Sequence, residues 1–554
     1  MISQPAADVL TISAAVPPRL RHTATDFMSS PAQRTAQSLP LPDLARLASW
    51  SDADWVGLRK RLIEVGFTRA NLKKLSQVAP GQLPQFAHPL VDWFLQSQHK
   101  PFANAARLLC LASPIAVDDA AKIFGSPRLD RMYEVGLLAD SDDRLVAAPF
   151  QILIFQDKYL LADDLHHGAE AVMACGGTTG SLLKAARPKG RLHRILDLGC
   201  GAGALALALA DRAQTVVAAD INPRALAFGR INAAMNGINN VEFRQGDLFA
   251  PVANEEFDLI VSQPPFIPMP EGSPPTTYLF GGSRGDELPM RLLPALPDHL
   301  ADGGRAVLLI QWPEFPGESI LRRMRKALRS RDTDLLSIVY PPMNLDVFAL
   351  VYSALDSHGA GKSFETEVVR WRAHFDRMQL RAIRPCFNVI RKRKQQVGWT
   401  RDVYPFSGRV TKQAIDQLLS RCDLLAAEDE AVLRSTLRFP STAFVTEQRS
   451  LTNAAGPELQ VDFAEDKIGR PVKVNQSMLR LLYDIHKSRT VSHGIHSRAA
   501  SEGTPKAAAI VKFMPHVRNA LEWGLLEVVE PKRSHRRRSS PLHTERSRQE
   551  RHQR

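Results

Sequence analysis

The sequence predicts an α/β fold in which a mainly parallel sheet occupies the middle of the chain and helical regions flank it. Between residues 171 and 395, short apolar runs alternate with segments of helical periodicity. The clearest runs are residues 194–198, 215–220, 241–244, 257–262 and 305–310. Runs that are apolar throughout, with about 10 to 15 helical residues between them, are typical of parallel strands buried on both faces. Two later runs, residues 335–340 and 347–352, lie close together and predict a hairpin or another antiparallel edge.

The chain has 554 residues. Since a domain has about 150 residues, the chain is long enough for several domains and is not a single one. Its hydrophobic share of 44% and charged share of 23% are those of a globular protein and exclude wholesale disorder. We expect five regions. They are a disordered arm (1–42), a helical and winged-helix-like N-terminal domain (43–170), the sheet domain (171–395), a mainly helical C-terminal domain (396–530) and a basic disordered tail (531–554).

The region before the sheet ends in a pattern of two helical segments, Gly136-Leu137-Leu138 and a short ribbon around the polar turn at residues 140–143. This order resembles a winged-helix unit. Residues 513–528, which contain a second Gly-Leu-Leu sequence directly after Trp523, suggest another such unit. Winged-helix units bind nucleic acid, bind proteins or serve as structural lids, and the sequence leaves these three roles open.

The charge is concentrated at one end of the chain. Lys and Arg number 71 against 58 Asp and Glu, and residues 531–554 alone hold nine basic and two acidic side chains. Such a tail is either simply solvated or a contact for nucleic acid through its phosphates.

Cysteine usage and hydropathy bear on the compartment. The five cysteines form no CxxC pair and predict no disulfide scaffold, so a reducing cytoplasm fits best. No apolar run is long enough for a membrane span, and the first residues lack the apolar core of a secretory signal. His166 and His167 have no evident ligand partners, so we expect no metal site.

Within residues 195–203, three glycines form a glycine-rich loop directly after the first predicted strand and before an alanine-rich helix. Glycine suits this turn because it adopts unusual backbone angles and because a Cβ would keep a ligand from the helix N-terminus. Gly199, Gly201 and Ala204, with Asp220 about twenty residues on, also satisfy the dinucleotide pattern GxGxx(G/A). The loop alone therefore leaves a nicotinamide or flavin cofactor and a purely structural turn open.

Three further features accompany the loop. Asp197 precedes the glycines, Gly246-Asp247-Leu248-Phe249 follows the third strand, and Ser262-Gln263-Pro264-Pro265-Phe266 follows the fourth. With residues 175–179, 220–225, 232–236 and 282–286, this ordered set resembles class I S-adenosylmethionine-dependent methyltransferases, in the methyltransferase small domain branch that includes release-factor glutamine and rRNA guanine-N2 methyltransferases. The resemblance implies a Rossmann-like fold with a mainly parallel seven-stranded sheet.

The resemblance also implies how S-adenosylmethionine is held. Gly199, Gly201 and Gly203 would approach its methionine part, and Asp220 would accept both ribose hydroxyls. Asp247 would receive the adenine amino group with Leu248 against the ring. Asp197 and Ile221 complete the expected cofactor-binding set.

The implied catalytic element is Gln263 with Pro264, Pro265 and Phe266. In the family an Asn or Asp stands first. Its side-chain carbonyl and the carbonyl of the next proline accept the two N–H groups of a planar amino group, and the aromatic residue stacks on it. This chain departs at Gln263, whose extra carbon extends the amide by about 1.5 Å.

The expected function is methyl transfer from S-adenosylmethionine to a planar amide or exocyclic amine on a protein, RNA or small molecule, with the N-terminal domain recognising this acceptor. The alternative is a non-catalytic nucleic-acid-binding or assembly protein that keeps the fold and its cofactor site. The basic tail favours the alternative, and the complete glycine and carboxylate set favours the enzyme.

Overall fold

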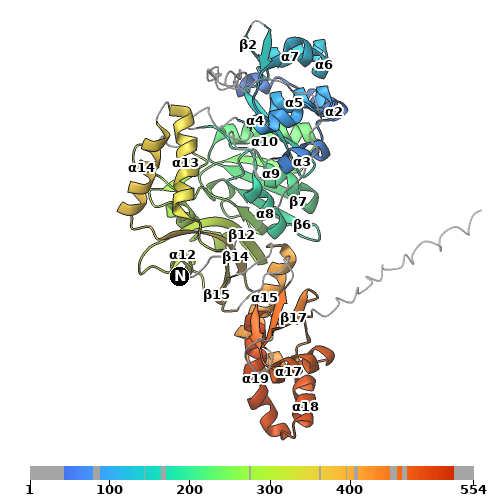
Figure 1. Ribbon diagram of the computed structural model, residues 1–554, viewed down its shortest axis with the longest axis vertical. Coiled ribbons are helices and arrows are strands. Elements are labelled where there is room, and N and C mark those ends of the chain that lie inside the picture. Colours follow the sequence, from blue (N-terminus) through green and yellow to red (C-terminus); the bar gives the residue numbers. More distant parts are fainter. Residues whose placement is uncertain are drawn as a thin grey trace, which may run out of the picture.

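The computed structural model describes residues 43–78, 88–142, 144–163, 170–273, 276–360, 363–394, 396–404, 410–448, 458–463 and 471–529. The predicted arm, the basic tail and His166-His167 lie outside these residues. In Figure 1 the N-terminal region lies at one end of the long axis, the sheet in the middle and the C-terminal region at the other end.

The N-terminal region begins with five helices. They are α1 (Leu44–Leu47), α2 (Asp52–Glu64), α3 (Arg69–Val78), α4 (His88–Leu95) and α5 (Lys100–Cys110). The helix α2 starts where it does because Ser51 and Asp54 form a reciprocal capping box. Its buried side chains Trp55, Leu58 and Leu62 recur at helical spacing and form part of the core of this region.

The two helices and ribbon predicted before the sheet are present. The chain forms β1 (Ile115–Ala116), α6 (Val117–Phe124), α7 (Ser126–Glu134), β2 (Ala139–Asp142) and β3 (Leu145–Ala147). The three strands pair in the order β1-β3-β2. A hairpin of β4 (Phe150–Phe155) and β5 (Lys158–Asp163) then leads to the central domain.

The central sheet has eight strands in the order β15-β13-β14-β12-β9-β6-β7-β8. These are β6 (Leu192–Leu198), β7 (Ala213–Asp220), β8 (Val241–Gln245), β9 (Phe257–Ser262), β12 (Leu300–Glu314), β13 (Thr333–Val339), β14 (Ala382–Lys392) and β15 (Thr400–Val403). Only β14 runs against its neighbours, between β12 and β13. The mainly parallel sheet is confirmed, and β15 adds an eighth strand to the expected seven by pairing parallel to β13.

The prediction of a second strand at residues 347–352 is wrong. This segment lies in the helix α13 (Leu345–Ala360), and the antiparallel strand is β14. Asn344 caps the helix by accepting hydrogen bonds from the backbone of Asp346 and Val347. Phe348 and Ala349 are buried while Val347, Leu350 and Val351 are exposed. In a helix, an unbroken apolar run is divided in this way between a buried face and an exposed face.

Helices cover both faces of the sheet. On one face lie α8 (Gly177–Ala186), α9 (Ala204–Leu209), α10 (Pro223–Asn236) and α15 (Lys412–Ala426). On the other lie α11 (Glu287–Leu292), α12 (Ile320–Leu328), α13 and α14 (Phe364–Arg377). Figure 1 shows α13 and α14 side by side, and the ring of Phe348 of α13 meets that of Trp371 of α14 edge to face.

The C-terminal region combines helices with short strands. Its elements are α16 (Asp429–Arg434), β16 (Leu437–Arg438), β17 (Ala443–Gln448), β18 (Glu458–Phe463), β19 (Val472–Val474), α17 (Gln476–Lys487), α18 (Val491–Ser501), α19 (Lys506–Trp523) and β20 (Glu527–Val528). The strands pair as β17-β18-β19 and as β16-β20. This region holds more strand than the mainly helical domain that the sequence suggests.

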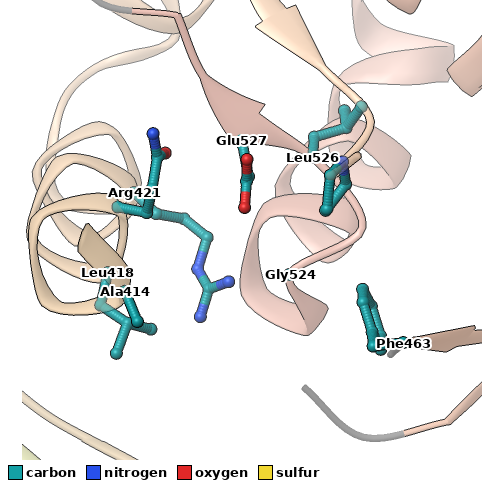
Figure 2. Close-up of a pocket in the computed structure, with 9 residues that line it drawn as sticks. Ala414, Leu418, Arg421, Phe463, Gly524, Leu526 and Glu527 are labelled. Atoms are coloured by element: carbon teal, nitrogen blue, oxygen red, sulfur yellow. The ribbon is translucent and has the colours of Figure 1, made fainter. Parts of the chain in front are cut away.

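The helix α15 connects the sheet domain to the C-terminal region. On one side its Asp423 accepts hydrogen bonds from Arg391 of β14 and from the Trp399 indole. On the other side Arg421 reaches toward the turn after α19, as Figure 2 shows. At that turn Gly524 has a φ of 77°, which favours glycine, and an added Cβ there would lie 2.5 Å from Arg421 Nη1, so the arginine side chain would have to shift.

Within the described ranges, no helix combines the length and apolar character that a membrane span requires. The same residues contain no group of three or more His, Cys, Asp or Glu side chains placed to hold a metal ion.

Candidate functional site

The residues predicted for the site emerge at the carboxyl ends of four adjacent strands. Leu198 of β6 is in register with Ser262 of β9, and Ser262 Oγ donates a buried 2.7 Å hydrogen bond to the Leu198 carbonyl. The glycine loop and Gln263 therefore leave the sheet side by side. Asp220 at the end of β7 is in register with Gln245 of β8, which places Asp247 at the same edge. Ligands of doubly wound sheets bind at this edge.

The three glycines of the loop have different surroundings. Gly199, Gly201 and Gly203 have φ values of 75°, 51° and 82°, a region that side chains other than glycine rarely adopt. A Cβ added at Gly199 or Gly201 would meet nothing within 4 Å, so this side of the loop is open. At Gly203 it would lie 3.3 Å from Phe243 and 3.4 Å from Gly229 Cα. Gly203 thus allows α9 and α10 to pack closely.

Asp197 lies beneath the loop. Its side chain is buried, and Oδ2 accepts a 2.9 Å hydrogen bond from the backbone N–H of Ala206 in α9. The pKa of Asp197 is raised to about 7, chiefly by burial; the Ala206 N–H lowers it and the Asp220 carboxylate adds to the rise. The residue ties the end of β6 to the first turn of α9.

Asp220 fixes the loop from the neighbouring strand. Oδ2 accepts from the Gly201 N–H at 2.8 Å and Oδ1 accepts from the Asn222 N–H at 2.9 Å. Burial raises the pKa of Asp220, opposed by these backbone N–H groups. A carboxylate offers about four acceptor sites, so two more hydrogen bonds are available to a ligand. Ile221 beside it is 55% exposed, which is unusual for its type and leaves an apolar surface at the same edge.

Asp247 and Leu248 lie in the turn after β8. Asp247 is exposed and forms a 2.7 Å ion pair with Arg291 of α11. Leu248 has a φ of 50°, an uncommon conformation for a residue with a Cβ. The Arg291 partner is 44 positions away in sequence, and no sequence pattern indicated it.

The segment from Gln263 to Phe266 is supported from behind by a glycine-rich turn. Directly after it, β10 (Ile267–Pro268) pairs with β11 (Phe280–Gly282). A Cβ added at Gly281 would lie 2.7 Å from the Pro265 carbonyl, and one at Gly285 would lie 2.7 Å from the Phe266 carbonyl. These contacts hold the backbone of Pro265 and Phe266 in place. Phe266 is largely buried in the core under the sheet edge.

The Gln263 amide has one satisfied and one unsatisfied end. Its Nε2 donates a 2.9 Å hydrogen bond to the Thr178 hydroxyl at the start of α8. Its Oε1 is buried and has no hydrogen-bond partner. Since buried carbonyl oxygens are rarely left unpaired, this atom indicates a place for a donor from outside the chain.

Residues that sequence reasoning missed close the site from the side. Asn222 Nδ2 donates to the Glu170 carbonyl at 3.0 Å and to Thr277 Oγ1 at 3.4 Å, which joins the segment before α8 to the loop after β10. Arg224 binds the buried Asp163 at the end of β5. The motif at residues 220–225 contained Asn222 and Arg224, but their partners come from distant segments.

The strand order, with the antiparallel β14 inserted between the parallel strands β12 and β13, and the glycine loop at the ligand edge define the class of Rossmann-like methyltransferases. Within that class, residues 177–276 match the family model described as methyltransferase small domain, which confirms the resemblance.

Several curated proteins are similar to part of the chain. A release factor glutamine methyltransferase of Xylella fastidiosa is 40% identical over 134 residues, covering 22% of this chain and 48% of that protein. One from Aliivibrio fischeri is 50% identical over 76 residues, covering 13% and 27%. A putative protein N5-glutamine methyltransferase of Methanocaldococcus jannaschii is 35% identical over 120 residues, covering 21% and 60%. The chain spans about half the length of the first of these relatives.

Proposed function

We propose that the chain is an S-adenosylmethionine-dependent methyltransferase that methylates the nitrogen of a primary amide, with a protein glutamine side chain as the acceptor. The observation that carries this proposal is the buried, unpartnered Gln263 Oε1 at the ligand edge of the sheet. The three relatives described above, whose names all include glutamine methyltransferase, support the acceptor class.

The residues present fit S-adenosylmethionine. The open side of Gly199 and Gly201 leaves room for its methionine part, and Asp220 keeps acceptor capacity for ribose hydroxyls. Ile221 and Leu248 offer apolar surface for the adenine ring. Asp247 can accept a hydrogen bond from the adenine amino group while it keeps its ion pair with Arg291. When bound, the cofactor supplies an electrophilic methyl group on a sulfonium.

The chain's own task is to present a weak nitrogen nucleophile. An amide nitrogen reacts poorly because its lone pair is delocalised, so orientation supplies much of the rate. Gln263 Oε1 accepts one N–H of the acceptor amide, and the Pro264 carbonyl accepts the other. The tight packing of Gly281 and Gly285 against Pro265 and Phe266 keeps both acceptors rigid.

We further propose that residues 43–170 recognise the acceptor protein, because β5 reaches the cofactor edge through the ion pair of Asp163 and Arg224. A cytoplasmic location is proposed from the five cysteines, all of which are free thiols.

The test supplies labelled S-adenosylmethionine to cell extract with the wild type or with Gln263→Ala, and separates the label into protein, RNA and small-molecule fractions. We expect label in protein with the wild type, and a rate lower by roughly one to three orders of magnitude with Gln263→Ala, the range for losing one preorganised polar contact.

The outcomes separate the alternatives. Label in RNA would indicate that the methyl acceptor is an exocyclic amine of a base and not a protein amide. Binding of S-adenosylmethionine in calorimetry without transfer to any fraction would favour the non-catalytic alternative. Equal rates with both proteins would remove Gln263 from the mechanism.

A further inference from the structure

The hydroxyl of Thr178 is the group that touches the non-reacting end of the Gln263 amide. We propose that Thr178 is a positioning residue, which holds this amide with its carbonyl turned toward the N–H of the methyl acceptor. The inference rests on the proposed function, because it assigns a role to a neighbour of Gln263 in that reaction.

Thr178 is itself held in place by the start of its helix. It is the second residue of α8, and the next residue, Thr179, accepts a 3.2 Å hydrogen bond from the Gly176 N–H. The helix α8 packs against the sheet through the buried Leu182 and Leu183. The hydroxyl thus stands on a rigid element, which suits a group that must orient another.

The bond to Thr178 holds the Gln263 amide in place. A primary amide presents a donor and an acceptor at opposite corners, and a hydroxyl can accept from the one or donate to the other. In the structure the Thr178 hydroxyl accepts from Nε2, and Oε1 is left as the buried acceptor without a partner. Without Thr178 the amide loses the hydrogen bond that holds it in this position.

The same contact gives a physical reason for glutamine at a position where the resemblance leads one to expect Asn or Asp. Glutamine carries one more carbon, about 1.5 Å of reach. At 2.9 Å from the Thr178 hydroxyl, the Gln263 Nε2 sits at ordinary hydrogen-bond length, so asparagine would fall short. Gln263→Asn should therefore lose the contact.

The experiment measures kcat and KM for labelled methyl transfer to the acceptor protein in four proteins: wild type, Thr178→Ala, Gln263→Ala and the double variant. Thr178→Ala should lower kcat roughly two- to tenfold, the effect of one neutral hydrogen bond, and leave KM and cofactor affinity within twofold. In the Gln263→Ala background, Thr178→Ala should have no further effect, since the two residues act through one contact.

Controls separate positioning from damage to the helix. Thr178 is exposed, so its truncation should not unfold the protein. Thr178→Ser keeps the hydroxyl and should restore kcat to within twofold of wild type. Ser181→Ala removes another exposed hydroxyl of α8, one that donates to the Gly177 carbonyl, and should change nothing.

A spectroscopic measurement does not need turnover. In protein labelled with 15N-glutamine, the side-chain amide signal that Gln263→Ala removes belongs to Gln263. Thr178→Ala should shift this signal away from its hydrogen-bonded position, and Thr178→Ser should preserve it.

An active wild type with unchanged kcat in Thr178→Ala, additive losses in the double variant, or an unaltered amide signal would each overturn the role of Thr178 while leaving the enzyme proposal intact. A wild type that transfers no methyl group overturns both.

Discussion

At the scale of single residues, the site is organised by carboxylates that bind backbone N–H groups. Asp220 joins the end of β7 to the glycine loop through Gly201, and Asp197 joins the end of β6 to α9. Their residue types and positions could be predicted from the sequence, because motif spacing places them at strand ends. Thr178 and Arg291 could not, since they reach the site from other elements by tertiary packing.

Cofactor affinity should depend on Asp220 and Gly201. Asp220→Ala removes a charged acceptor and the anchor of the loop, and should weaken S-adenosylmethionine binding by roughly 2 to 4 kcal/mol. Gly201→Val adds a side chain on the open side of the loop and strains a φ of 51°. Isothermal calorimetry measures both affinities.

Gly237→Val is the matched control for strain, because Gly237 also has a positive φ and open surroundings but ends α10. If both site variants bind the cofactor as tightly as Gly237→Val does, these residues do not hold it.

The raised pKa of Asp197 makes stability depend on pH. The folded state favours the neutral carboxyl, so its contribution is complete below the unfolded pKa of about 4 and is lost as pH rises toward the folded pKa of about 7. Asp197→Asn mimics the neutral form, and its melting temperature relative to wild type should rise between about pH 4 and pH 7 and level off above. Parallel melting curves across this range would contradict the assignment.

At the scale of elements, α10 attaches to the hairpin before the domain by side chains that mimic a strand. Asn232 accepts from the Leu161 N–H at 2.7 Å and donates to the Leu161 carbonyl at 3.0 Å, and Asn236 does the same for Tyr159. The sequence indicated the helix and this Asn-containing motif. The sequence could not indicate that β5 is their partner, because the residues of a helix do not specify which strand edge the helix packs against.

Asn232→Ala should destabilise the fold by about 3 kcal/mol, because it leaves two buried backbone groups of Leu161 and the Ala202 carbonyl without this partner. Urea unfolding measures the loss. Asn71→Ala is the comparison, since Asn71 is only half-buried and donates to the nearby Gly66 carbonyl, and its cost should be about 1 kcal/mol or less. If the two variants lost the same free energy of unfolding, the hydrogen bonds to β5 would contribute no more than the single bond of Asn71.

At the scale of the whole molecule, the sheet domain extends beyond residue 395, where the sequence predicts its end. β15 extends the sheet, and α15 packs Leu418 and Leu419 into the same core cluster as Leu336 and Val389. At the end of the predicted sheet domain, Arg391 and Arg393 bind the buried Asp334 and the partly exposed Asp423 of α15, so a packed network crosses the predicted boundary.

A chain that ends at residue 395 should therefore fail to unfold cooperatively, because it uncovers the apolar cluster and leaves Asp334 without the N–H of Trp399. A chain that ends at residue 529 keeps every described element and should melt at the wild-type temperature. Thermal circular dichroism compares the two. A cooperative transition at the same temperature in the shorter chain would mean that α15 and β15 are accessory.

The eighth strand also bears on how the protein avoids sticking to copies of itself. All seven residues of β13 are buried. Without β15, this strand would be the edge of the sheet, and its unpaired backbone N–H and C=O groups would be a template for aggregation with another sheet. β15 covers this edge with four residues, Thr-Arg-Asp-Val, whose Arg401 pairs with Glu522 and whose Asp402 is exposed. The outermost strand at this side of the sheet is thus short and charged, which is how natural sheets discourage a second molecule from adding itself to the edge.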